Sequence, residues 1–264
     1  MSREFTVAAV DTRLRGVDSF GDGPPLLFLN GGFSTRRQWN RVISRLGDRY
    51  RTVRFDGRTS RGRGACAEYS VRDAIDDVDR VIEATVLERP VLVGWSHGAT
   101  IAVCYAAEHP ELVGGLVLVD GAYPVSLFDE AGKDGVRERL RGSRRLARCV
   151  ALLGGAAGMS PRQRAEAVIA TDEVNGGLVA DFAALRCPTV FVVRSGRRPG
   201  APQEQARRMR AAAAQAAAGN AQVTVFATAT GRPARLLARD AGIVAAAIDE
   251  VAARRWAGLR PPVA

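Results

Sequence analysis

Short apolar runs alternate with longer amphipathic segments along most of the chain, and this alternation is the feature that most constrains the fold. It is typical of β–α–β units in a largely parallel sheet. Buried parallel strands read as continuous apolar runs, as Leu26–Leu29 and Leu116–Val119 do. We predict strands at Phe5–Val10, Thr12–Val17, Pro25–Leu29, Thr52–Phe55, Val91–Trp95, Leu116–Asp120, Thr189–Val193 and Gln222–Phe226, and helices at Thr35–Leu46, Val71–Leu87, Ser96–Glu108, Gln203–Ala218 and Arg239–Trp256.

One long stretch, residues 121–186, interrupts the alternation. It contains no convincing strand, and it carries basic residues over Arg137–Arg148 and a glycine cluster over 154–158. Long insertions in compact folds usually cover or form binding sites. We therefore expect an α/β core made of residues 1–120 and 187–264, with a helical insertion at 121–186.

The charge balance is strongly basic, with 38 arginines and lysines against 28 acidic residues and a net charge of +10. All but one of the basic residues, Lys133, are arginines, and they are spread along the chain. That spread is typical of a GC-rich genome rather than of a nucleic-acid-binding face, so no nucleic-acid partner is expected.

Membrane, metal and cofactor classes are also disfavoured by the sequence. A membrane span needs roughly 20 consecutive apolar residues, which no window provides. The segment Met1–Phe5 lacks an apolar signal core, so we expect a cytoplasmic protein. Four cysteines without metal-ligand spacing and two histidines predict no metal site, and no cofactor motif is present.

The pentapeptide Gly94-Trp95-Ser96-His97-Gly98 follows a predicted strand and precedes a predicted helix. This G-x-S-x-G pattern in a strand–turn–helix context predicts a sharp turn with Ser96 at its tip. Small residues are required on either side because the turn is tight. The backbone N–H of His97, at the helix N-terminus, would then face a developing oxyanion.

A second glycine-rich turn, Asn30-Gly31-Gly32-Phe33, follows the predicted strand Pro25–Leu29. Gly32 or Phe33 could donate another backbone N–H to the same oxygen. With these two turns the sequence resembles the α/β-hydrolase superfamily over nearly the whole chain, although Asn30 stands where the family usually has histidine. The resemblance implies an eight-stranded, mostly parallel sheet flanked by helices, and it identifies residues 121–186 as a cap inserted after the sixth strand.

The same resemblance implies a serine–acid–histidine triad, and this sequence departs from it twice. The family's acid follows the strand Thr189–Val193, where the best match places Arg198. The family's histidine follows the last strand, where Arg232 stands. Asp120 could replace the acid, since some relatives carry it after the preceding strand. We interpret both histidines of the chain as structural, so Ser96 lacks an evident base.

The two arginines leave three interpretations open. They could bridge Asp120, they could bind a substrate carboxylate with bidentate hydrogen bonds, or they could extend to solvent. We place both Arg198 and Arg232 among the candidate substrate-binding residues. The others are Asn30, Trp95 and Tyr123, which could line a pocket near Ser96.

Loss of the triad histidine costs a serine hydrolase roughly a million-fold in turnover, or about 8 kcal/mol. We therefore expect an atypical enzyme that uses its oxyanion hole for epimerisation, isomerisation or cyclisation of a small molecule or modified peptide, as in natural-product tailoring. The sequence is similar in kind to the bottromycin-type peptide epimerases, which keep the fold and lack the base. The alternatives are a serine esterase with an unrecognised base, and a non-catalytic ligand-binding protein.

Overall fold

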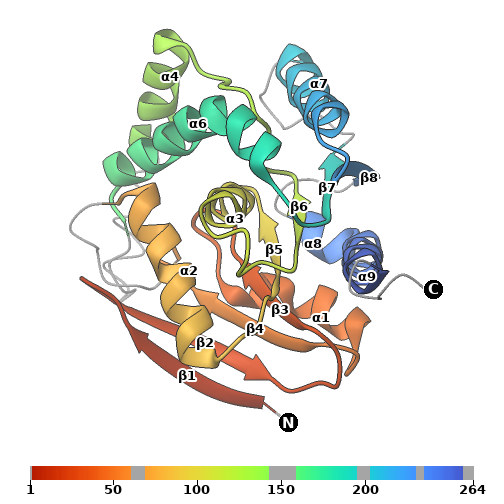
Figure 1. Ribbon diagram of the computed structural model, residues 1–264. Coiled ribbons are helices and arrows are strands. Elements are labelled where there is room, and N and C mark those ends of the chain that lie inside the picture. The colour runs from red at the N-terminus through yellow and green to blue at the C-terminus, as the bar shows by residue number, and fades with distance from the viewer. Residues whose placement is uncertain (1, 61–68, 143–158, 195–202, 230–234, 258–264) are drawn as a thin grey trace.

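The computed structural model describes residues 2–60, 69–142, 159–194, 203–229 and 235–257. These residues form an eight-stranded sheet in the order β1-β2-β4-β3-β5-β6-β7-β8. Strand β2 pairs antiparallel with both of its neighbours, β1 and β4, and every other neighbouring pair is parallel (Figure 1). The strands are β1 (Ser2–Ala8), β2 (Arg13–Ser19), β3 (Pro25–Leu29), β4 (Arg51–Asp56), β5 (Val91–Trp95), β6 (Gly115–Val119), β7 (Thr189–Arg194) and β8 (Val223–Ala229).

Helices cover both faces of this sheet. They are α1 (Asn40–Leu46), preceded by the 3-10 turn η1 (Arg36–Trp39), then α2 (Val71–Thr85), α3 (His97–Glu108), α4 (Glu130–Gly142), α6 (Pro161–Ala184), α7 (Gln203–Gly219), α8 (Leu236–Arg239) and α9 (Ala241–Ala257). One apolar core packs α2, α3, α6 and α7 on one face, and a second packs α1, α8 and α9 on the other.

The central strands are buried on both faces, which is why they read as apolar runs. Every residue of β6 is buried, as is every residue of β7. The predicted strands and helices are therefore confirmed in kind and order, with ends that differ by a few residues. At the start of α2, Ser70 accepts a hydrogen bond from the backbone N–H of Asp73 and so caps the helix.

Among the described residues, two helices, α4 and α6, lie between β6 and β7, and we call them the inserted helices. Figure 1 shows them above α3, on the side of the molecule where β5 ends. A capping box between Ser160 and Gln163, with Pro161 at the first turn, fixes the start of α6. The proposed boundaries of the insertion, at residues 121 and 186, remain a prediction. Within the described ranges, no helix is long and apolar enough to cross a membrane.

Candidate functional site

Ser96 occupies a strained turn between β5 and α3. Its backbone has φ 53° and ψ −115°, a conformation that L-residues rarely adopt. A Cβ atom on Gly98 would lie 2.3 Å from the carbonyl oxygen of Leu29, and one on Gly94 would lie 2.5 Å from the Cα of Ala99. Both glycines are required by close packing, so the G-x-S-x-G pattern here reflects the geometry of a nucleophile elbow.

The candidate oxyanion hole lies beside this turn. The backbone N–H groups of Ala99 and Thr100 donate to the carbonyl of Ser96, whereas among the described residues the N–H of His97 has no acceptor. Phe33, across from it, has a positive φ of 64°, and a Cβ on Gly32 would lie 3.8 Å from the Cβ of His97. The two turns predicted to supply N–H donors therefore lie next to each other.

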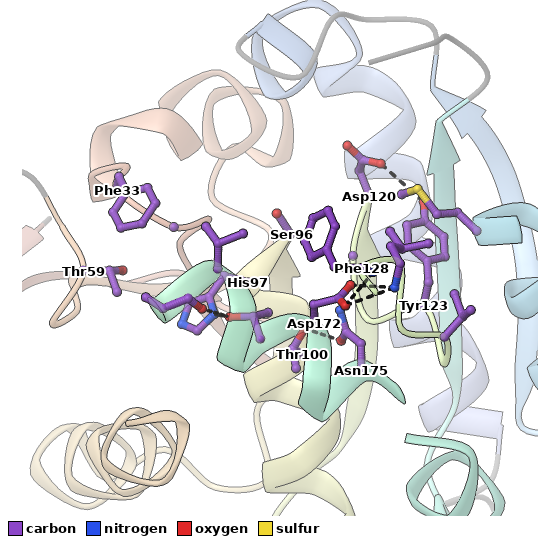
Figure 2. A pocket seen from close by; sticks show the side chains of 18 residues that line it. Phe33, Thr59, Ser96, His97, Thr100, Asp120, Tyr123, Phe128, Asp172 and Asn175 are labelled. Atoms are coloured by element: carbon purple, nitrogen blue, oxygen red, sulfur yellow. Dashed lines mark hydrogen bonds between the residues drawn. The ribbon is translucent and has the colours of Figure 1, made fainter. Parts of the chain in front are cut away.

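A cavity of about 190 Å³ opens beside Ser96. Its walls come from the two turns, from the segment after β6 and from α6. In Figure 2, Phe33 and Thr59 lie on one side of Ser96, and Asp120 and Tyr123 lie on the other. The described lining residues are Gly32, Phe33, Thr59, Ser96, His97, Thr100, Asp120, Gly121, Tyr123, Val125, Leu127, Phe128, Ala167, Val168, Thr171, Asp172, Asn175 and Met209.

Asp120 follows β6 directly and is almost completely buried. Its Oδ2 lies 3.5 Å from Nε of Arg194, the last residue of β7, and the hydroxyl of Tyr123 donates to its Oδ1 at 3.4 Å. Burial raises the pKa of Tyr123 well above its usual value, so the phenol stays protonated. The backbone next to Asp120 is pressed against the elbow, because a Cβ on Gly121 would lie 2.3 Å from the carbonyl oxygen of Ser96.

The side chain of His97 points away from the Ser96 hydroxyl (Figure 2). Its Nε2 lies 2.7 Å from the hydroxyl of Tyr69, and its Nδ1 lies 2.9 Å from the hydroxyl of Thr171 on α6. Burial lowers the pKa of the imidazole to about 4, so the ring is neutral at physiological pH. Both ring nitrogens are therefore occupied by hydrogen bonds to residues other than the serine.

A second carboxylate in the cavity wall, Asp172 on α6, has a structural role. It accepts hydrogen bonds from the backbone N–H groups of Leu127 and Phe128 at 2.9 to 3.1 Å and from the hydroxyl of Ser126 at 2.7 Å. These bonds hold the segment after β6 against α6. Three donors thus engage this carboxylate, and one of them, the N–H of Leu127, reaches both oxygens.

Two residues predicted to bind substrate, Asn30 and Trp95, do not line this cavity. The amide of Asn30 donates to the carbonyl of Phe55 at 2.8 Å and accepts from the indole of Trp39 at 3.0 Å, so it ties β3 to β4. The ring of Trp95 packs on Gly31, where an added Cβ would lie 2.7 Å away. Both are structural because they face the interior beneath the two turns.

Tyr123 does line the cavity, as predicted, through its position after β6. Arg198 and Arg232 lie outside the described residues. Among the residues that are described, no group of three or more His, Cys, Asp and Glu side chains is placed to bind a metal ion.

Several residues of the site were missed from the sequence. Arg194 carried a signal, because a charged residue ends the apolar run Thr189–Val193, and such a residue lies at the carboxyl edge of a parallel sheet. Thr171, Asp172 and Asn175 carried none, since they occupy ordinary polar positions of a long helix and only the docking of α6 brings them to the cavity.

Comparison with known proteins agrees with this architecture. Residues 24–142 match the model of a family described as the alpha/beta hydrolase fold. The chain is 31% identical over 124 residues to a 2-(acetamidomethylene)succinate hydrolase of Mesorhizobium japonicum, covering 46% of this chain and 42% of that protein. It is 34% identical over 141 residues to a 2-hydroxymuconate semialdehyde hydrolase of a Pseudomonas species, covering 52% of this chain and 48% of the relative. The chain thus spans less than half the length of these relatives.

Solved structures match over almost the whole chain. An E-2-(acetamidomethylene)succinate hydrolase superposes with a TM-score of 0.66 at 20% identity, covering 95% of this chain and 99% of the other. An esterase from Exiguobacterium antarcticum superposes with a TM-score of 0.71 at 19% identity, covering 94% and 99%. The sheet order, the elbow and these matches together show that the protein has the α/β-hydrolase fold.

Proposed function

We propose that this protein is a non-hydrolytic enzyme of the α/β-hydrolase fold, which stabilises the oxyanion or enolate of a small carbonyl compound. The observation that carries the proposal is the position of the two histidines, the only two in the 264-residue sequence. Neither imidazole is placed to take a proton from Ser96. A serine nucleophile without a base keeps little of its turnover.

His97 is excluded as a base by its contacts with Tyr69 and Thr171. His109 is excluded by distance, because it follows the last residue of α3, a helix of 12 residues that begins just after Ser96. At about 1.5 Å per residue, Ser96 and His109 lie roughly 20 Å apart along the helix. The ring of His109 instead contacts Tyr105, with centroids 4.7 Å apart.

The remaining groups suit proton transfer at carbon. A carbonyl oxygen held by the N–H groups of His97 and of Gly32 or Phe33 would be stabilised as negative charge develops on it. The carboxylate of Asp120 would accept the proton from the adjacent carbon. Its return to another position of the enolate gives isomerisation, and its return to the opposite face after the enolate has turned in the cavity gives epimerisation, with no net loss of atoms. Ser96 would act as a hydrogen-bond partner for the substrate.

The cavity supports a small substrate. At about 190 Å³ it accommodates a small molecule, or a single side chain of a modified peptide, rather than an extended chain. None of its described lining residues is lysine or arginine. A substrate carboxylate would therefore depend on Arg198 or Arg232, the candidates from the sequence.

The relatives support the fold and the elbow more than the reaction. The family match ends at residue 142, before β7 and β8, whose following loops carry the acid and the histidine in the family. The hydrolase names of the relatives describe proteins of which this chain covers less than half. We infer that the reaction has diverged together with residues 143–264, which lie outside the family match.

A fluorophosphonate probe tests the proposal directly, because it labels serines that are activated by a base. We expect no rapid labelling of Ser96, with Ser96→Ala as the matched control. Rapid labelling of the unmodified protein, with no labelling of Ser96→Ala, would overturn the proposal in favour of a serine esterase.

A second experiment looks for the proposed chemistry. Small esters, thioesters and 1,3-dicarbonyl compounds would be incubated with the protein in D2O, and loss of the α-proton signal followed by NMR. We expect exchange to be catalysed for a compound that fits the cavity and to fall roughly 100-fold or more in Asp120→Asn. A compound that binds without any catalysed exchange would instead support a ligand-binding protein.

A further inference from the structure

Helix α6 contacts both sides of the candidate oxyanion hole. The hydroxyl of Thr171 lies 2.9 Å from Nδ1 of His97. The guanidinium of Arg164 lies over the ring of Phe33, 5.4 Å from its centroid. One turn beyond Thr171, Asn175 accepts a hydrogen bond of 2.8 Å from Thr100 in the first turn of α3. Two contacts from one inserted helix therefore fall on the turns that carry the candidate N–H donors, and a third falls on the first turn of α3.

The hydrogen bonds around His97 define its tautomer. Thr171 donates its hydroxyl proton to the carbonyl of Ala167 at 2.7 Å, as threonine commonly does within a helix. Its oxygen must therefore accept from the imidazole, which places the proton on Nδ1. Nε2 is then an acceptor, and the hydroxyl of Tyr69 donates to it at 2.7 Å. The neutral ring thus donates a hydrogen bond from Nδ1 and accepts one at Nε2.

The ring lies between two cavities. His97 and Thr59 line the main cavity beside Ser96, and both also line a smaller cavity of about 40 Å³ together with Tyr69. The ionisable groups that border these cavities are Arg58, Asp77, Asp120, Tyr123 and Asp172, besides Tyr69. Burial lowers the pKa of the imidazole.

The ring and the candidate donor N–H belong to the same residue, so contacts that hold the ring also restrain the backbone segment that carries this N–H. The turn that carries Gly32 lies next to His97, because a Cβ added to Gly32 would lie 3.8 Å from the Cβ of His97. Short, directional hydrogen bonds at both ring nitrogens hold the side chain in one orientation. Side chains held in this way commonly support a reacting group that they do not themselves contact.

We propose that His97 is a positioning residue, which as the neutral Nδ1–H tautomer connects the inserted helix α6 to the oxyanion hole. Docking of α6 through Thr171 orients the backbone N–H of His97, and Tyr69 supports the ring from the opposite side. The inference rests on the proposed function for the role of the N–H, but the state of the ring is measured independently of any reaction. Fluorophosphonate labelling and the ring measurement can therefore succeed or fail separately.

The test uses NMR of the full chain labelled with ¹⁵N-histidine, in which only His97 and His109 contribute ring signals. We expect the His97 ring to show the Nδ1–H tautomer and to remain neutral down to a pH of about 4. In Thr171→Val the acceptor for Nδ1–H is lost, so we expect a shift toward the Nε2–H tautomer and a displaced backbone amide signal of His97. Thr171→Ser keeps the hydroxyl and should restore both signals.

Thr228→Val is a matched control, since it makes the same substitution at an exposed position on β8. It should leave the signals of His97 unchanged. If Thr171→Val does not fold, Tyr69→Phe provides the second variant, in which the Nδ1–H tautomer persists and the Nε2 resonance moves. An Nε2–H tautomer in the unmodified protein, titration of His97 near pH 6.5, or ring and amide signals unaffected by Thr171→Val would each overturn the proposal.

Discussion

The carboxylate of Asp120 and the guanidinium of Arg194 form a buried ion pair at the ends of two adjacent parallel strands. Their side chains are 1% and 4% exposed, and the Oδ2 and Nε atoms lie 3.5 Å apart. A buried carboxylate requires an opposite charge nearby, since its desolvation is costly. The structure therefore gives Asp120 an arginine partner on β7 itself, four residues before Arg198 in the sequence.

Replacing Arg194 by methionine should strongly destabilise the protein, because it leaves the Asp120 carboxylate buried without its countercharge. We expect the free energy of unfolding to fall by about 3–5 kcal/mol, measured by urea denaturation. The double variant Arg194→Met/Asp120→Leu should recover much of that loss. Arg207→Met, at an exposed position of α7, is the control and should change stability by less than about 0.5 kcal/mol. An equally small effect for Arg194→Met would show that the pair is not needed.

The glycines of the elbow predict a second stability difference. Gly98→Ala places a Cβ 2.3 Å from the carbonyl oxygen of Leu29, a contact with rigid backbone that cannot be relieved locally. We expect this variant to be recovered mainly as unfolded or aggregated protein. Gly177 lies at an exposed position of α6, with nothing within 4 Å of an added Cβ. Gly177→Ala should therefore stabilise the protein by about 0.5–1 kcal/mol. Circular dichroism during thermal unfolding distinguishes the two.

The sheet and the elbow could be predicted from the sequence because local patterns determine them. Strands buried on both faces must be apolar throughout, and a turn as tight as that at Ser96 requires glycine at fixed positions. The side-chain partners could not be predicted in the same way. Asn30 and Trp95 lie close to the site in sequence but face inward, and only the packing beneath the turns decides this.

The part of the site that comes from α6 illustrates the same limit. Thr171 and Asp172 are adjacent in the sequence, yet one contacts the elbow and the other holds the segment after β6. Neither role follows from helical periodicity, since both depend on where the inserted helix docks. The sequence predicted that residues 121–186 would be helical, without indicating which residues would reach the cavity.

Asp172→Ala should detach the segment after β6 from the inserted helix. The substitution removes the acceptor of the backbone N–H groups of Leu127 and Phe128, which lie in a partly buried segment. An unsatisfied donor costs about 1–3 kcal/mol when it is fully buried, and less where water reaches it. We expect a lower free energy of unfolding and faster amide hydrogen exchange at residues 126–128. Glu173→Ala, at the neighbouring exposed position, is the control. Unchanged exchange in Asp172→Ala would contradict the structural role assigned to this carboxylate.

The neutral imidazole of His97 predicts a specific dependence of stability on pH. The folded-state pKa is about 4, below the usual value of 6.5, so between these limits the unfolded chain binds more protons than the native protein. The contribution of neutral His97 to stability is thus complete above pH 6.5 and declines as the pH falls toward 4, by up to about 3 kcal/mol. We expect the difference in free energy of unfolding between the unmodified protein and His97→Asn to become smaller as the pH falls from 6.5 to 4, and to be constant above pH 6.5.

Urea denaturation at half-unit pH steps measures that difference, and the same series on His109→Asn shows whether the change belongs to His97. A difference that is independent of pH between 4 and 6.5 would mean that the ring is not held in its neutral form.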